Sequence, residues 1–347
     1  PGHWFVILNS INDNPQLEKK FQGQGDELSD LEWDIKSYFI LGGVMHDVAI
    51  SVWGIKGWYD YIRPISAIRY FSEQGQRSDP TLDNYSENGF ELIEGLIEIV
   101  EDGDVLAGDN NENLGKVKLF TWKGHSYIDD TESDFAGVDW ILADNWWPYQ
   151  RPTFVTPNFA GYVSGHSTFS RAAAEMLENF TGSPYFPGGL ETHLAKQKEF
   201  LVFEDGPSED IELQWVSYKD AADQCSLSRI WGGIHPYIDD IPGRLIGQII
   251  GNESFEFGAE YFQNNLSDAE IQIPSLRLMK NPISNTENIR LINTNGLETF
   301  ELYSITGQIV NVTAKFREGI TELIPDNLSA GIYILTSNEI NFKVVVR

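Results

Sequence analysis

The hydrophobic period of the chain changes once, and this change constrains the fold more than any other feature. Up to residue 262, apolar residues recur at helical spacing in six segments, which are 30–54, 88–101, 164–180, 190–204, 217–231 and 240–262. Beyond the IQIPS segment, apolar and polar residues alternate in ENIRLINT, QIVNVTAKF and INFKVVVR, and Gly and Asn turns separate these runs. We therefore predict a mainly α, helical domain over residues 1–270 and a small β-sandwich over residues 275–347.

The charge of the chain divides at the same place. Residues 275–347 contain seven basic and seven acidic residues, so residues 1–274 carry the whole formal charge of −28. A composition shift that coincides with a change of period indicates a domain boundary. The acidic surface excludes nucleic acid as a partner, because phosphates would be repelled over the whole domain.

Membrane insertion and disulfide bonding are both disfavoured by the sequence. No segment approaches the roughly 18 uninterrupted apolar residues of a membrane span. The longest candidate, residues 38–55, contains His46 and Asp47 and is predicted to be a buried helix. Cys225 is the only cysteine, so no disulfide forms within the chain; this neither requires nor excludes export.

The stretch GYVSGHSTFSRAAAEML, residues 161–177, places three unusual residues at the start of an apolar helix. Ser164 is a good N-cap, and the free N–H groups and positive dipole end of a helix favour a bound anion. Gly165 lets an anion approach the backbone closely, and His166 adds a proton donor. Taken alone, the pattern is also typical of a plain helix cap beside a surface histidine.

Two further stretches place cations in apolar, aromatic surroundings. Lys56 precedes Arg63 in KGWYDYIRPISAIRY, and Arg229 precedes His235 and Asp239 in SLSRIWGGIHPYIDD. A lone Lys or Arg is usually a surface charge. Buried cations that converge need an anionic ligand, because an unpaired buried charge is costly. Since Arg offers a planar fork of donors and Lys a point charge, we predict a pocket for a tetrahedral oxyanion.

The order and spacing of the three stretches resemble one superfamily, which contains the vanadium-dependent haloperoxidases and the type 2 phosphatidic acid phosphatases. Its pattern is Lys-x6-Arg-Pro, then Pro-Ser-Gly-His, then Ser-Arg-x5-His-x3-Asp. This chain departs from it only at Val163, which stands in place of the usual Pro. A β-branched residue can hold an extended position, so we expect no effect on the chemistry. The resemblance implies a core of packed helical bundles, and it leaves open whether N-terminal helices are missing.

The resemblance also implies a role for each matching residue. His235 would be the metal ligand of vanadate, the implied cofactor, or would attack phosphorus in a phosphatase, and Asp239 would orient it. His166 would be the acid–base group. The oxygens of the cofactor would be held by Lys56, Arg63, Arg229, Ser164 and the amide of Gly165. Lys56 would in addition polarise the bound peroxide. A neutral imidazole is a common metal ligand or nucleophile, which agrees with these roles.

The motifs alone leave two enzyme classes open. Trp53 and Phe159 stand where haloperoxidases have aromatic residues near the presumed halide site, and a Phe at the second place resembles the chloride-oxidising branch. Core packing is the alternative for both rings. We predict a haloperoxidase that oxidises halide with hydrogen peroxide to hypohalous acid, with or without an organic acceptor. The alternative is a soluble acid phosphatase that forms a phosphohistidine, and a third reading is an oxyanion binder without turnover.

The tail resembles the C-terminal sorting domain of type IX secretion. KNPISNTENIRL, FELYSITGQIV and LSAGIYILTSNEINFKVVVR follow one another between residues 276 and 347. The resemblance implies a bacterial protein that the type IX machinery exports to the cell surface or the medium. A carbohydrate-binding or interaction domain is the alternative, although Tyr303, Tyr333 and three Phe make no aromatic platform.

Overall fold

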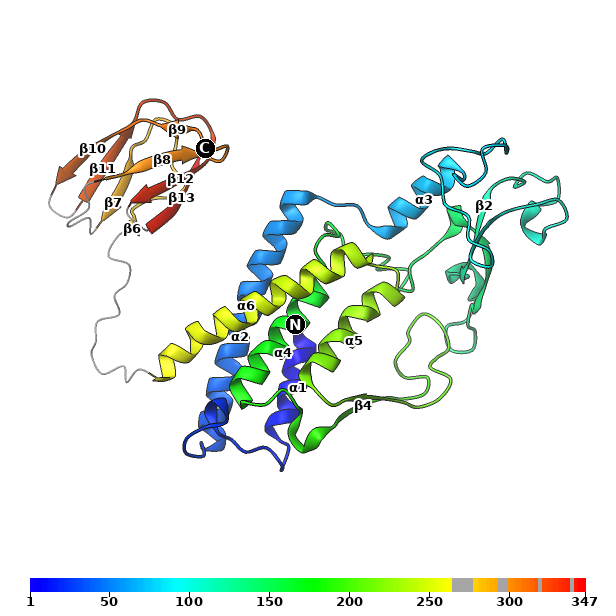
Figure 1. Ribbon diagram of the computed structural model, residues 1–347, viewed down its shortest axis with the longest axis horizontal. Helices are drawn as coiled ribbons and strands as arrows, with labels where there is room; N and C mark the ends of the chain where they lie inside the picture. The colour runs from blue at the N-terminus through cyan, green and yellow to red at the C-terminus, as the bar shows by residue number, and fades with distance from the viewer. Residues whose placement is uncertain (264–276, 293–298, 318–319, 338–339) are drawn as a thin grey trace. The chain divides into compact units, whose positions relative to one another are not determined.

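The computed structural model describes residues 1–263, 277–292, 299–317, 320–337 and 340–347 (Figure 1). The chain forms two compact units, residues 1–265 and 266–347. The domain limits expected from the sequence, 270 and 275, lie outside the described residues.

Six α-helices form the framework of the described part of the first unit. They are α1 (Gly2–Asn12), α2 (Asp30–Tyr59), α3 (Pro64–Gln74), α4 (Gly165–Thr181), α5 (Tyr218–Trp231) and α6 (Tyr237–Gln263). Short 3-10 turns lie at Phe21–Gly23, Val105–Ala107, His125–Tyr127, Ala143–Asn145 and Pro187–Gly189. The helices predicted at 30–54, 164–180, 217–231 and 240–262 correspond to α2, α4, α5 and α6. Serine side chains cap α2, α4 and α5 by accepting a hydrogen bond from the N3 amide.

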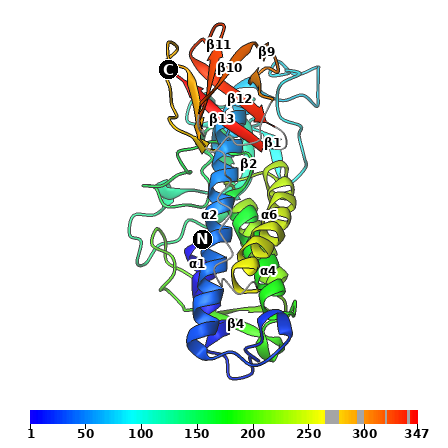
Figure 2. The same cartoon turned by 90° about the vertical axis from the view of Figure 1, so that its left-hand side faces the viewer.

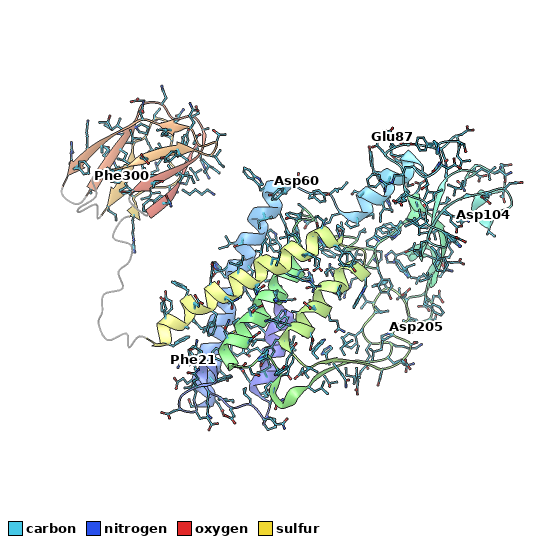
Figure 3. All side chains as sticks on the ribbon, viewed as in Figure 1. Phe21, Asp60, Glu87, Asp104, Asp205 and Phe300 are labelled. Carbon is cyan, nitrogen blue, oxygen red and sulfur yellow. The ribbon has the colours of Figure 1, made fainter. Side chains whose placement is uncertain are left out.

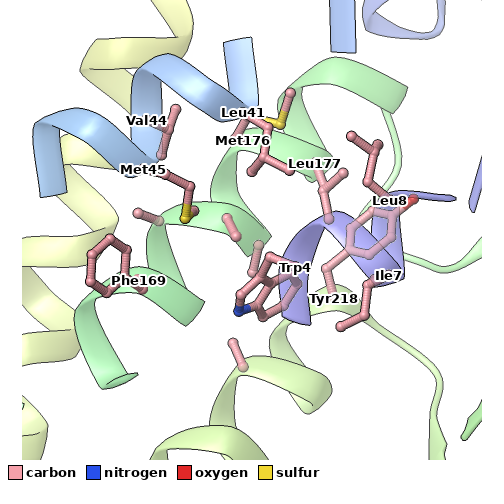
Figure 4. Close-up of a cluster of buried hydrophobic side chains, with 14 of the residues drawn as sticks. Trp4, Ile7, Leu8, Leu41, Val44, Met45, Phe169, Met176, Leu177 and Tyr218 are labelled. Carbon is pink, nitrogen blue, oxygen red and sulfur yellow. The ribbon is translucent and has the colours of Figure 1, made fainter. Parts of the chain in front are cut away.

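The helices α2, α4 and α6 run side by side (Figures 1 and 2). Between them and α1 lies one hydrophobic core, and Figure 4 shows Trp4, Leu41, Met176 and Tyr218 meeting there from four helices. Trp4 donates its indole N–H to Ser170 on α4 at 3.0 Å. The core therefore fixes α4, whose first turn carries the Ser-Gly-His sequence.

Glycines bring α4 and α6 into close backbone contact. A Cβ at Gly247 would lie 2.5 Å from the carbonyl oxygen of Thr168, and one at Gly251 would lie 2.6 Å from that of Ala172. At Gly243 it would lie 2.9 Å from the carbonyl oxygen of Ser164. Only glycine permits this approach, which places the start of α4 against the start of α6.

The helix α2 is apolar on several faces. By length and composition alone, the segment Asp30–Gln74 is long and apolar enough to cross a membrane. One face of α2, however, contributes Trp33, Leu41, Val48 and other buried residues to the core. Of the most apolar window of this segment 33% is buried, and other large apolar residues of α2, such as Phe39, Ile50 and Trp58, are exposed.

The helices predicted at residues 88–101 and 190–204 do not form, so both predictions are wrong. Residues 88–101 contain turns, isolated bridges and β1 (Ile97–Ile99). This strand pairs with β2 (Val117–Trp122), and β2 pairs with β3 (Val138–Leu142). Gly95 has a φ of +77°, so the helical spacing is broken before β1. Within 190–204, β4 (Glu191–Ala195) forms a hairpin with β5 (Ile211–Trp215) instead. Both segments find cross-strand partners that local periodicity does not reveal. Glu87 and Asp104 in Figure 3 mark the irregular segment that joins α3 to β2.

The described part of the second unit contains two four-stranded antiparallel sheets. One has the order β10-β11-β7-β6 and the other β13-β12-β8-β9. The strands are β6 (Arg277–Leu278), β7 (Ile289–Ile292), β8 (Glu301–Ser304), β9 (Ile309–Val310), β10 (Val312–Arg317), β11 (Ile320–Pro325), β12 (Gly331–Ser337) and β13 (Ile340–Val346). Leu291 and Leu323 of one sheet and Leu302 and Leu335 of the other belong to one buried cluster. The tail is therefore built of sheets, and its arrangement as a sandwich stays a prediction.

Candidate functional site

Two of the predicted cations lie buried at the C-terminal end of α2 and the start of α3. Lys56 is 2% exposed and donates from Nζ to the carbonyl oxygens of Ala160 and Gly161, at 2.9 and 2.7 Å. Arg63 is the N-cap of α3, and the chain turns toward it after Asp60, which ends α2 in the left-handed conformation (Figure 3). Its guanidinium donates to the carbonyl oxygens of Phe159, Ala160 and Ile234. Both cations thus hold the segment that leads into α4.

His235 lies at the centre of the cluster, directly before α6. Its Nδ1 lies 2.6 Å from Oδ2 of Asp239, one turn along, and its Nε2 lies 3.1 Å from Nη1 of Arg63. Arginine can only donate. The pairing therefore places the single imidazole proton on Nδ1 and leaves Nε2 as a lone-pair nitrogen. Gly161 permits this packing, because a Cβ there would lie 3.0 Å from Oδ2 of Asp239.

The start of α4 is held against the start of α6. The amide of Ser164 donates to the carbonyl oxygen of Asp239 at 2.9 Å, and the side chain of Ser164 caps α4. Gly165 is buried, and a Cβ there would lie 3.9 Å from the ring of Trp53. His166 reaches solvent. Val163, the departure from the family pattern, is fully buried.

Arg229 closes the cluster from the last turn of α5. Its carbonyl oxygen accepts from the amides of Ile234 and His235, at 2.9 and 3.3 Å, which ties this turn to the histidine. Among the described residues, the buried Nε of Arg229 has no hydrogen-bond partner, and neither has the buried Oδ1 of Asp239. The site thus retains a donor on Arg229 and an acceptor on Asp239 that the described residues do not satisfy.

The two aromatic candidates lie against the cations. The rings of Trp53 and Phe159 are 4.9 Å apart. Nζ of Lys56 and the guanidinium carbon of Arg63 lie 5.3 and 5.5 Å from the centre of the Phe159 ring. Phe159 is 36% exposed and Trp53 43% exposed, so neither is a core residue. The pair forms a partly open apolar wall beside the cluster.

Burial, and to a smaller extent mutual repulsion, lowers the pKa values of the basic side chains in the cluster. Desolvation, followed by the charge of Arg63, lowers the pKa of Lys56 to about 7, although Asp239 opposes the shift. Desolvation also lowers the pKa of Arg63 to about 10 and that of His235 to about 4. For His166, desolvation and then the charge of Arg229 lower the pKa, even though its ring reaches solvent. A bound anion would offset these shifts.

The structure brings all ten predicted residues into one neighbourhood. Sequence reasoning missed the acceptors that Lys56 and Arg63 use, which are backbone carbonyl groups and carry no signature in the side-chain sequence. It also missed Ser167 and Asp240, which lie next to motif residues and contact each other at 2.6 Å. The two adjacent aspartates of HPYIDD could have pointed to Asp240, because two neighbouring buried carboxylates need different partners.

The described residues of the first unit also line a cavity away from this cluster. A cavity of about 720 Å³ lies between the end of α3 and the loops around Tyr85 and Leu114. Its lining contains no histidine and mixes Glu73 and Asp83 with Lys116. Among the described residues, no group of three or more His, Cys, Asp or Glu side chains could hold a metal cation.

Comparison with known proteins shows which fold carries this site. Residues 111–264 match the family of the VCPO second helical-bundle domain. Two solved structures are similar, the apo-type and holo-type bacterial vanadium-dependent chloroperoxidase, each with a TM-score of 0.50. The chain has the helical-bundle fold of vanadium chloroperoxidase. Sequence identity is 18% to the apo structure and 17% to the holo structure.

The similarity to the chloroperoxidases is partial. The matches cover 75% and 76% of this chain but only 42% of the chloroperoxidase chains. This chain therefore spans less than half the length of those proteins. No curated protein sequence matches it.

Proposed function

We propose that the first unit is a vanadate-dependent haloperoxidase that oxidises halide with hydrogen peroxide. One observation carries the proposal most directly. The lone-pair Nε2 of His235 faces Arg63, beside the desolvated Lys56 and Arg229, and Asp239 holds the opposite ring nitrogen. The chloroperoxidase fold supports the same reading.

The residues of the cluster fit vanadate as a cofactor. The unprotonated oxygens of a tetrahedral oxyanion accept hydrogen bonds, and the buried Nε of Arg229 is a donor without a partner among the described residues. His235 would hold the vanadium through Nε2. The oxygens would be held by Lys56, Arg63, Arg229, Ser164 and the amide of Gly165. Bound vanadate would supply Lewis-acid activation of hydrogen peroxide.

The remaining chemistry belongs to this chain. His166 has a lowered pKa, so at neutral pH its imidazole is uncharged and can take a proton from hydrogen peroxide. Lys56 would hold its ammonium N–H toward the reacting oxygen, and an anionic ligand would keep it protonated. The wall of Trp53 and Phe159 would exclude water beside these groups and receive the halide.

The same pocket suits a phosphatase, in which Nε2 of His235 would attack phosphorus. A paired assay on metal-stripped protein separates the two. One half receives orthovanadate, hydrogen peroxide and chloride, bromide or iodide in turn, and halogenation of a dye is measured. The other half receives a chromogenic phosphate monoester. We expect vanadate-dependent halogenation. Phosphate release that vanadate inhibits, without halogenation, would replace the proposal by the phosphatase.

We also propose that residues 275–347 act as a type IX sorting domain and that the protein is exported. The sheets of this unit and the order of its sequence landmarks support the proposal. Expression in a bacterium with a type IX system, with and without these residues, tests it. Export of the shortened chain at the level of the full chain would contradict it.

A further inference from the structure

A second buried carboxylate lies beside the site and takes no part in the chemistry above. Asp240 follows Asp239 in the first turn of α6 and is 1% exposed. Adjacent residues of an α-helix point about 100° apart. Asp239 therefore faces His235, while Asp240 faces α4.

Asp240, on α6, is linked to α4 by a hydrogen bond and to α5 through the guanidinium of Arg244. Arg244 donates from Nε to Oδ1 of Asp240 at 3.1 Å, and its Nη2 lies 3.0 Å from Oδ2. Nη1 of the same guanidinium lies 2.7 Å from Asp223 on α5. On the other side, Oγ of Ser167 on α4 donates to Oδ1 of Asp240 at 2.6 Å. Arg244 thus compensates the buried charge and anchors it to α5.

Ser167 passes this anchorage on to Ser164. Its Oγ lies 2.9 Å from Oγ of Ser164, and its amide donates to the same oxygen at 3.3 Å. A hydroxyl has a single proton, and the carboxylate of Asp240 is the closer and stronger acceptor. Ser167 is therefore held by Asp240, and its amide, which donates to Oγ of Ser164, fixes the position of that oxygen. Both serines are fully buried.

We propose that Asp240 is a positioning residue for the oxyanion site. Acting through Ser167, it sets the first turn of α4, which presents Ser164, the amide of Gly165 and His166 to the ligand. The inference rests on the proposed function, because it assumes that this turn binds an oxyanion. It assigns to Asp240 a role separate from that of Asp239, which orients His235.

The test measures the dissociation constant of orthovanadate by calorimetry on the full chain, together with the midpoint of thermal unfolding. Ser167→Ala should weaken binding about tenfold, equivalent to about 1.4 kcal/mol, since the first turn of α4 loses the hydroxyl that ties it to Asp240. Asp240→Asn should act alike. Arg244 faces both carboxylate oxygens of Asp240, so in either orientation the NH₂ group of the amide meets a guanidinium N–H, and the contact that holds Ser167 is displaced. The substitution also preserves size and serves as the second variant if Ser167→Ala does not fold.

The matched control is Ser170→Ala, the same substitution three residues along α4. Ser170 is buried and accepts from Trp4, so its loss costs stability without touching Asp240. Its vanadate affinity should equal that of the wild type. The double variant Ser167→Ala/Asp240→Asn should bind no more weakly than either single variant, because both act along one path.

Three results would overturn the inference. They are wild-type affinity in Ser167→Ala, equal weakening in Ser170→Ala, and additive losses in the double variant. If the wild type binds no vanadate, the proposed function fails and the inference fails with it. Vanadate binding that the variants leave unchanged would refute the inference alone.

Discussion

At the scale of single residues, the pairing of His235 with Asp239 sets which imidazole nitrogen is available. Desolvation lowers the pKa of the ring, and the carboxylate opposes that shift and fixes the ring proton on Nδ1. Asp239→Asn should lower the turnover of the vanadate-loaded enzyme by roughly 10- to 100-fold, the usual effect of removing such a partner. Steady-state halogenation measures this, and nitrogen NMR of the His235 ring reports the tautomer. Asp60→Asn, at the exposed end of α2, is the control and should retain full activity. An unchanged rate in Asp239→Asn would contradict the role.

Lys56 gives the site a pH dependence of known sign. Its pKa is about 7 without a ligand, so the ammonium is charged below that pH and neutral above it. An oxyanion binds the charged form, so affinity should be constant below pH 7. Above it, the dissociation constant should rise, by up to tenfold per pH unit, with uptake of one proton. Calorimetry with tungstate, a tetrahedral dianion throughout this range, measures both. Lys56→Met should bind more weakly and show no proton uptake at pH 8; uptake equal to wild type would refute the assignment.

The side chains that gather in the candidate site could be predicted from the sequence, because the three motifs specify their types and spacing. His235 and Asp239 stand one helical turn apart, and Ser164 is recognisable as a cap. The carbonyl groups that Lys56 engages were not predictable, since any residue supplies a carbonyl and only the fold places it.

At the scale of elements, the contact between α4 and α6 depends on glycine. Gly247→Ala would place a Cβ 2.5 Å from a backbone oxygen of α4 and should destabilise the protein by about 1–3 kcal/mol. Gly43→Ala in α2 meets nothing within 4 Å. It should stabilise the protein by about 0.4–1 kcal/mol, because alanine loses less chain entropy in a helix. Urea unfolding of both variants provides the comparison. Equal effects of the two substitutions would show that the helices are not packed as described.

Elements with strong local signals were the predictable ones. A serine cap precedes α2, α4 and α5, and each helix follows where its apolar period predicts it. Residues 88–101 and 190–204 were misjudged because their apolar spacing is satisfied by strand pairing. The partners of β1 and β4 lie in Val117–Trp122 and Ile211–Trp215, which local periodicity could not connect to them.

At the scale of the whole molecule, charge distinguishes the two units. Residues 1–274 carry the whole net charge of −28, so repulsion between their acidic side chains opposes folding. Added salt should screen this repulsion. All ten tryptophans lie between Trp4 and Trp231, so their fluorescence reports the first unit only. We expect the midpoint of its thermal unfolding to rise when sodium chloride is increased from about 0.05 to about 0.5 M, because the screening length falls over this range. A midpoint that falls with added salt would mean that attractive ion pairs dominate this unit.

The central claim is that one oxyanion binds between Lys56, Arg63 and Arg229 and is held by Nε2 of His235. Equilibrium dialysis of the full chain against micromolar orthovanadate, with elemental counting of vanadium, tests it most directly. The account predicts one vanadium per chain in the wild type and none retained by His235→Ala. A wild type that retains no vanadium, or a His235→Ala variant that retains as much, would contradict it.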